Sequence, residues 1–108
     1  MNKFTKLISN NGNDTLKRRA TTISQTAEIA QQNLVNDLKQ KKAEIDLKID
    51  NLTDLAPETT DSLRPGSKDW DPAKWAKELQ QAKQNRYMLE IQLKLAQETY
   101  DEYFKEGD

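Results

Sequence analysis

The chain has 108 residues, 34% of them hydrophobic and 32% charged, and a formal net charge of −1 at pH 7. It has neither cysteine nor histidine, which excludes disulfides, thiol nucleophiles, Cys/His zinc sites and the commonest general base. The length allows one small domain, and the balanced charge gives no overall field that would point to nucleic acid or to an anionic membrane.

Residues 1–12 form an N-terminal segment, a short helix or an arm. Phe4, Leu7 and Ile8 fall on one helical turn, and Gly12 suits the end of a helix. The segment has no apolar core of a signal peptide, and no apolar run in the chain approaches the ~20 residues that span a bilayer. We therefore expect a cytoplasmic protein, or a virion protein if its source is a phage.

Residues 13–108 are predicted to form a helical hairpin: a helix over 14–56, a loop over 57–70 and a helix over 71–106. Asn13 or Asp14 offers an N-cap oxygen for the first helix. Its apolar spacing contains an extra step of four residues and then a gap at Lys41 and Lys42, which predicts a stutter and weak packing there. The predicted stripe is Leu16, Ala20, Ile23, Ala27, Ala30, Leu34, Leu38, Ile45, Ile49, Leu52 and Ala56.

The loop contains Pro57, Pro65 and Gly66, and Asp71 followed by Pro72 is typical of the start of a helix. The apolar residues of the second helix return in alternating steps of four and three, the spacing of a coiled coil. The stripe, in which Arg86 is the one charged member, is Trp75, Leu79, Ala82, Arg86, Leu89, Leu93, Ala96, Tyr100 and Tyr103.

Two long helices joined by one loop predict an all-α fold, a long antiparallel two-helix hairpin resembling a coiled coil. Folding back at the loop would place Leu34 near Leu93 and Ile23 near Phe104. At the same end Tyr100, Tyr103 and Phe104 would form a core capped by Phe4 and Leu7.

A second apolar strip lies on the second helix. Met88, Ile91 and Leu95 fall more than about 100° away from the main stripe, so one partner helix cannot cover both. The first helix has a weaker counterpart in residues outside its main stripe, namely Ile29, Val35 and Leu47. We interpret the second strip as an interface through which hairpins assemble into a larger helical bundle. The alternative is that these are ordinary exposed apolar residues.

Two groups of cations are candidate anion contacts. Lys17, Arg18 and Arg19 form the densest basic cluster, and could contact phosphate or nucleic acid. The favoured interpretation pairs them with the acidic residues near the C-terminus, which are Glu98, Asp101, Glu102, Glu106 and Asp108.

Arg86 is the polar residue within the second stripe. Its stem is expected to pack while its head reaches a carboxylate, such as that of Glu44 or Asp37, on the facing helix. The alternative is that Arg86 presents its charge to an anionic ligand at an interface between chains.

Trp70 and Trp75 flank the start of the second helix. Trp75 lies on the stripe and is expected to close the loop end of the hairpin. Trp70 either packs back on it as a hydrophobic staple or forms a tip that binds a partner.

The pattern contains no catalytic constellation, so we expect no enzyme, no cofactor and no metal. It favours a non-enzymatic helical structural or assembly protein, a small subunit of a homo-oligomer or of a larger bacterial or bacteriophage complex. A small regulatory binder or inhibitor, acting through the exposed strip, is the alternative. A third hypothesis is an oligomer that binds an anionic ligand such as a nucleotide or a nucleic acid.

Overall fold

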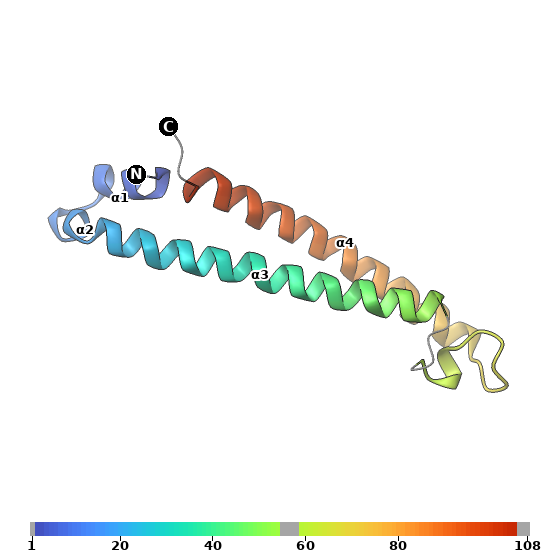
Figure 1. The fold of residues 1–108 in the computed structure, drawn as a ribbon. Helices are drawn as coiled ribbons and strands as arrows, with labels where there is room; N and C mark the ends of the chain where they lie inside the picture. Colours follow the sequence, from blue (N-terminus) through green and yellow to red (C-terminus); the bar gives the residue numbers. More distant parts are fainter. Residues whose placement is uncertain (1, 55–58, 106–108) are drawn as a thin grey trace. The chain divides into compact units, whose positions relative to one another are not determined.

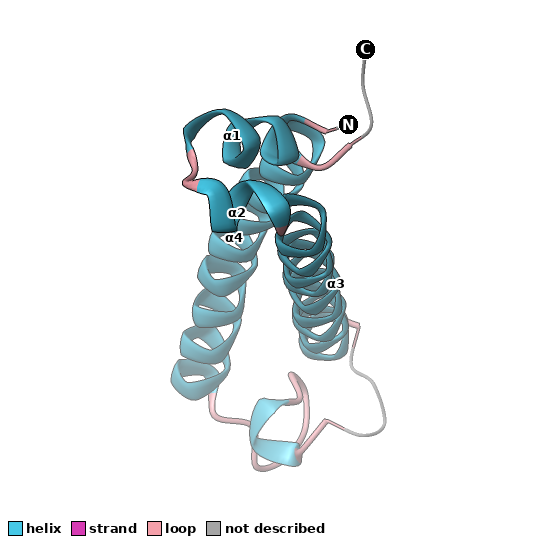
Figure 2. Ribbon diagram, turned by 90° about the vertical axis from the view of Figure 1, so that its left-hand side faces the viewer, coloured by secondary structure: helices cyan, strands magenta, loops and turns pink. Residues whose placement is uncertain are grey.

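The computed structural model describes residues 2–54 and 59–105, and within these ranges the regular elements are helices, with no strand. In chain order they are α1 (Lys3–Asn11), α2 (Asp14–Arg18), α3 (Ala20–Thr53), the 3₁₀ turn η1 (Asp61–Leu63) and α4 (Pro72–Tyr103), as Figure 1 shows. Figure 2 shows the same elements coloured as helix. The predicted all-α helical hairpin is confirmed.

The chain divides into two compact units. The first unit consists of Met1–Asp37 with Gln92–Asp108, and the second is Leu38–Ile91. Both α3 and α4 contribute residues to each unit. Within the first unit α1 lies beside the end of α4, and α2 lies at the start of α3 (Figure 1).

The first helices are short because the sequence caps them closely. The side chain of Asn2 accepts a hydrogen bond from the Thr5 N–H at the start of α1. At the end of α1, a Cβ on Gly12 would lie 2.7 Å from the Ile8 carbonyl oxygen and 2.8 Å from the Leu16 Cβ, so only glycine fits. The Asn13 side chain then caps α2, as predicted.

The helix predicted over 14–56 is interrupted at Arg19, where α2 ends and α3 follows. The Arg19 N–H donates to the carbonyls of Thr15 and Leu16, each at 3.2 Å. The local sequence contains neither glycine nor proline, so nothing in the pattern marks this break. At the other end α3 stops at Thr53, and the predicted stripe residue Ala56 and the loop residue Pro57 lie outside the described residues.

The inward face of α3 differs from the prediction at two positions, Ala30 and Leu34, which are exposed. The other predicted stripe residues of α3 are buried or half-buried: Ala20, Ile23, Ala27, Leu38, Ile45, Ile49 and Leu52. Val35 and Leu38 are buried, with 6% and 7% of their surface exposed, whereas Leu34 is 46% exposed. The predicted stutter is therefore wrong, because polar side chains occupy inward positions that an apolar count passes over. One series of buried or half-buried positions repeats in steps of four and three: Ser24, Glu28, Gln31, Val35, Leu38, Lys42, Ile45, Ile49 and Leu52. Beside this series Ile23, Ala27, Asp46 and Asn51 are also half-buried.

The predicted inward stripe of α4 is confirmed, because every residue of it is buried or half-buried. The Asp71 carboxylate caps the helix by accepting from the Lys74 N–H at 3.1 Å. In the first unit, the Gln31 side chain donates to the Ala96 carbonyl at 2.9 Å. The predicted pairing of Leu34 with Leu93 has this same register, because Gln31 lies three residues before Leu34 and Ala96 lies three residues after Leu93.

A buried polar cluster fixes α1 against α3 in the first unit. The side-chain oxygen of Asn2 accepts from the Thr5 hydroxyl at 2.8 Å and from the Ser24 hydroxyl at 3.2 Å, and all three residues are buried. Beside them the ring of Phe4 lies 5.0 Å from that of Phe104, centre to centre. Leu7 is 49% exposed, so the predicted cap is formed by Phe4 and not by Leu7.

Candidate interaction face on α4

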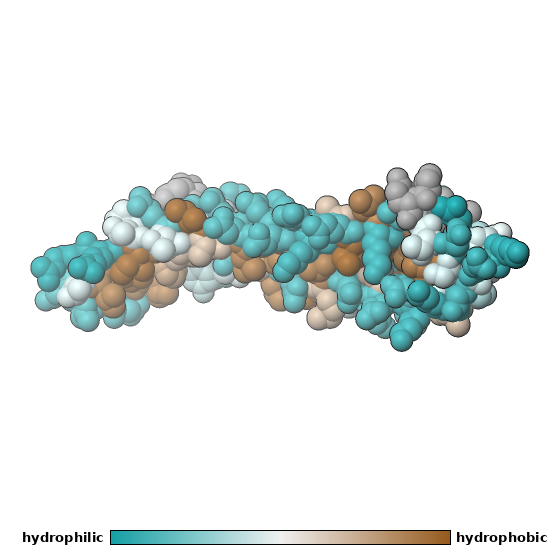
Figure 3. All heavy atoms as spheres, turned by 90° about the horizontal axis from the view of Figure 1, so that it is seen from below, coloured by the Kyte–Doolittle hydropathy of each residue, from teal (hydrophilic) through white to brown (hydrophobic). Residues whose placement is uncertain are grey.

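The predicted second strip is exposed. Met88, Ile91 and Leu95 have 53%, 38% and 58% of their surface accessible, and all three belong to the unbroken helix α4. Figure 3 shows hydrophobic side chains at the surface among hydrophilic ones on one face of the molecule. Apolar residues this exposed on a helix that already buries its other face form a candidate binding surface.

The exposed strip is the centre of a longer seam, which we call the outer seam. Its positions follow one another in steps of four and three, and every one is exposed: Lys77, Gln81, Gln84, Met88, Ile91, Leu95, Glu98 and Glu102. Helix α4 thus has an inner heptad seam covered by α3 and, on its exposed side, an apolar strip that polar residues extend at the same spacing. The polar ends of the outer seam escaped the prediction, which followed apolar residues alone.

Charge is ordered along the outer seam. Lys77 stands at its N-terminal end, and Glu98 and Glu102 stand at its C-terminal end. Between them lie two glutamines and the apolar strip. The seam therefore has a positive end, an apolar centre and a negative end.

Within the second unit an open groove of about 730 Å³ runs along α4 from Trp75 to Met88. Tyr87, which is 63% exposed, contributes one wall. The groove shares Gln84 and Met88 with the outer seam. A convex side chain of a partner can therefore settle beside these two residues.

The exposed apolar residues of α3 were predicted in part. Ile29 and Leu47 are 57% and 60% exposed, as expected, but Val35 is buried. Leu34 is exposed instead. The inward positions of α3 around it are Gln31, Val35 and Leu38.

Trp70 packs against Trp75 within the second unit. Its ring meets that of Trp75 edge-on, with 6.0 Å between ring centres and 71° between planes. The Trp75 indole N–H donates to the Leu52 carbonyl at 3.0 Å, which ties the start of α4 to the end of α3. The Trp70 indole nitrogen is buried and has no hydrogen-bond partner among the described residues. Trp70 is thus half-buried against Trp75, as in the staple interpretation, with part of its ring at the surface.

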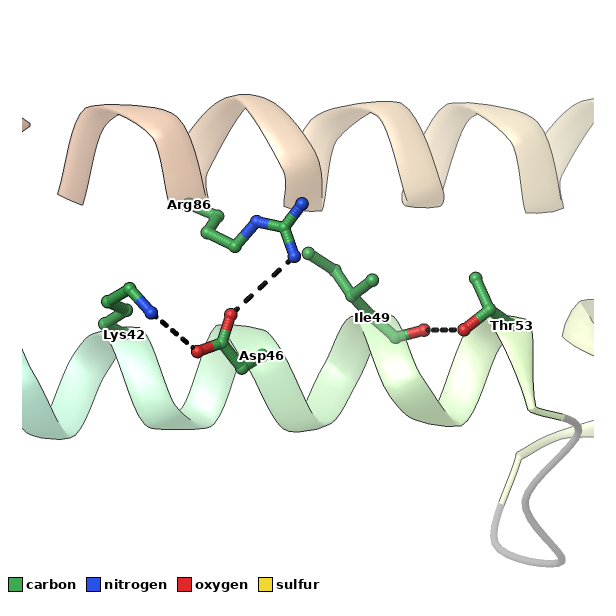
Figure 4. Close-up of polar contacts among 5 residues, drawn as sticks. All are labelled: Lys42, Asp46, Ile49, Thr53 and Arg86. Atoms are coloured by element: carbon green, nitrogen blue, oxygen red, sulfur yellow. Dashed lines mark hydrogen bonds and ion pairs between the residues drawn. The ribbon is translucent and has the colours of Figure 1, made fainter. Parts of the chain in front are cut away.

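Arg86 reaches across to α3 in the second unit, as Figure 4 shows. Its Nη1 lies 3.8 Å from Oδ1 of Asp46, and the Nζ of Lys42 lies 2.9 Å from the other oxygen of the same carboxylate. The prediction that Arg86 reaches a carboxylate on the facing helix is confirmed. The carboxylate is that of the half-buried Asp46 and not that of Glu44 or Asp37, which are exposed. One carboxylate thus faces two cations on the inner seam.

The basic cluster is exposed at all three positions, Lys17, Arg18 and Arg19. Arg18 donates to the Asp14 carbonyl at 3.4 Å, and none of the three forms an ion pair with a residue in the described ranges. The predicted pairing with the acidic C-terminal residues is therefore not formed there. Two of those, Glu106 and Asp108, lie outside the described residues.

Lys3, and not the basic cluster, pairs with one of the acidic residues near the C-terminus. Its Nζ donates to the Glu102 carboxylate at 2.9 Å and lies 5.4 Å from the centre of the Tyr103 ring. The hydrogen bond to Glu102, followed by the negative charge of that carboxylate, raises the pKa of Lys3. Both side chains are more than half exposed, so the pair adds little stability.

Three further observations bear on function. Over the described part of the chain, no three acidic residues lie together in a way that could hold a metal ion. No described helix combines the length and apolar character that crossing a membrane requires. In comparisons with known proteins, no protein-family model, no curated protein and no solved structure matches the chain.

Proposed function

We propose that the protein is a non-enzymatic helical assembly protein that binds protein through the outer seam of α4. The observation that carries this proposal is the unbroken run of exposed heptad positions with Met88, Ile91 and Leu95 at its centre. A heptad seam is the pattern by which one helix packs against another. On α4 the inner seam is covered by α3, and the three apolar residues at the centre of the outer seam remain exposed.

Energetics support a further protein surface on this face. Covering apolar area is worth roughly 25 cal/mol per Å², and a two-helix hairpin buries little area per residue. A partner on the outer seam would therefore add stability that the hairpin lacks. The Cys-free composition, rich in Asn, Lys and Gln, suits a structural component of a bacterium or bacteriophage, located in the cytoplasm or the virion.

Sedimentation equilibrium tests the proposal. We expect the wild-type chain to form a defined oligomer, and the double variant Ile91→Glu/Leu95→Glu to sediment as a monomer with unchanged helical circular dichroism. The matched control is Ile29→Glu/Leu47→Glu, which adds the same charge at two exposed apolar residues of α3. It should leave the oligomer intact.

Two results would contradict the proposal. A wild-type chain that stays monomeric at high concentration would remove self-association as the function. Equal dissociation in both double variants would show that added charge, and not the outer seam, controls assembly.

A small regulatory binder is the second candidate, favoured by the groove between Trp75 and Met88 with the exposed ring of Tyr87 on its wall. A groove of this kind fits an apolar anchor from another protein. This candidate predicts a folded monomer in the same sedimentation experiment.

A further inference from the structure

We propose that the occupant of the outer seam is a second copy of this chain, with the two α4 helices antiparallel about a two-fold axis between Met88 and Ile91. This inference rests on the proposed function and adds the identity, direction and register of the partner. Its basis is the order of charge along the seam, which makes the seam complementary to itself when one copy is reversed.

Reversing one copy about this axis gives a consistent set of facing positions. Met88 faces Ile91 of the second copy, and Gln84 faces its Leu95. Further out, Gln81 faces Glu98 and Lys77 faces Glu102. The two-fold axis repeats each layer, so the apolar side chains meet at the centre and opposite charges meet at both ends.

Charge decides against the parallel arrangement. In a parallel pair in register, Lys77 would face Lys77, and Glu98 and Glu102 would face their own copies. Like charges in facing positions are destabilising, and an antiparallel pair avoids all three contacts. In the antiparallel pair Glu102 would be shared between Lys77 of the second copy and Lys3 of its own chain, to which it is already bonded.

The register follows from the apolar centre. A shift by one heptad in one direction would place Met88 opposite Glu98, and a shift in the other direction would place Leu95 opposite Lys77. Each shift desolvates a charge against an apolar side chain, which is unfavourable. The flanking positions agree with the unshifted register, since Tyr87 then lies beside Lys94 of the second copy, a cation–π arrangement.

Charge substitutions at Gln81 test direction and register together. Gln81→Lys would face Glu98 of the second copy, while Gln81→Glu would place two carboxylates opposite each other. We expect the dimer dissociation constant to fall by about threefold or more in Gln81→Lys and to rise similarly in Gln81→Glu. High salt should narrow the difference. Asn36→Lys and Asn36→Glu, at an exposed position of α3, are the matched controls and should change little.

Cross-linking provides an independent readout, because the chain has no cysteine of its own. The variants Gln81→Cys and Glu98→Cys, mixed and treated with a short bismaleimide, should cross-link to each other. Neither should cross-link to itself, because equivalent residues lie about 25 Å apart along the axis of an antiparallel pair.

The outcomes separate this inference from the proposed function. Opposite effects of the two Gln81 variants and cross-linking only in the mixture would support the antiparallel pair. Weakening by both variants, with cross-linking of each variant to itself, would establish a parallel pair and overturn the inference, while the proposed function stands. An oligomer that responds to Ile91→Glu/Leu95→Glu but to neither Gln81 variant would overturn the register. A monomeric wild type would overturn both proposals.

Discussion

Gln31 of α3 donates its side-chain amide to the backbone carbonyl of Ala96 on α4, 2.9 Å away. Ala96 is 6% exposed, and its small side chain lets the glutamine approach the helix backbone. A polar residue thus occupies an inward heptad position and bonds directly to the opposite helix. Together with Ser24 and Glu28, it makes the inner seam of the first unit partly polar.

We expect Gln31→Ala to lower the free energy of unfolding by about 1 kcal/mol, the usual worth of one such hydrogen bond. Urea denaturation followed by circular dichroism measures the change. Asn33→Ala, at an exposed position of the same helix, is the control and should have less effect. Equal losses in the two variants would mean that the bond to Ala96 contributes nothing.

The shared carboxylate of Asp46 leads to a second prediction. Asp46→Asn leaves Lys42 and Arg86 without their common anion on the inner seam, and should cost about 1 kcal/mol of stability. Arg86→Met should cost less, because the carboxylate keeps Lys42 and methionine packs in the seam. Urea denaturation measures the loss of stability in both variants. A larger loss in Arg86→Met than in Asp46→Asn would contradict the view that Asp46 is the shared partner of the two cations.

The contact between Lys3 and Glu102 predicts a dependence on alkaline pH. Because the pKa of Lys3 is raised in the folded chain, its contribution is fully present below the ordinary value of 10.5 and is lost as the pH rises through the folded value. The melting temperature of Lys3→Met should therefore lie slightly below that of the wild type at pH 8. The two should converge above the folded pKa. A difference that persists there would show that the contact does not depend on the charge of Lys3.

The accuracy of the sequence prediction depended on how apolar the inward positions are. On α4 each inward residue except Arg86 is apolar or aromatic, so the stripe and the register were predicted correctly. On α3 the inward positions include Ser24, Glu28 and Gln31, whose polar groups are satisfied by bonds to other parts of the first unit. Their partners lie far away in sequence, so local spacing favoured Ala30 and Leu34, which are exposed.

The exposed strip was predicted because Met88, Ile91 and Leu95 lie too far around the helix from the main stripe to face the same partner helix. The rest of the outer seam was not, since its ends are lysine, glutamine and glutamate, which look like any solvated helix surface. Exposure at heptad spacing alone does not distinguish it, because the line from Ala76 through Tyr87 to Lys94 is exposed in the same way. The apolar strip at its centre is what sets the outer seam apart. The break at Arg19 had no signal in the sequence.

The edge-on packing of Trp70 and Trp75 gives the molecule its own optical probe. These are the only tryptophans in the chain, and both belong to the second unit. Tryptophan emission therefore follows the loss of structure around the start of α4, whereas circular dichroism at 222 nm, a wavelength fixed by the peptide group, follows all helices at once. If the two curves coincide during denaturation, the units unfold together. If they separate, each unit has a stability of its own.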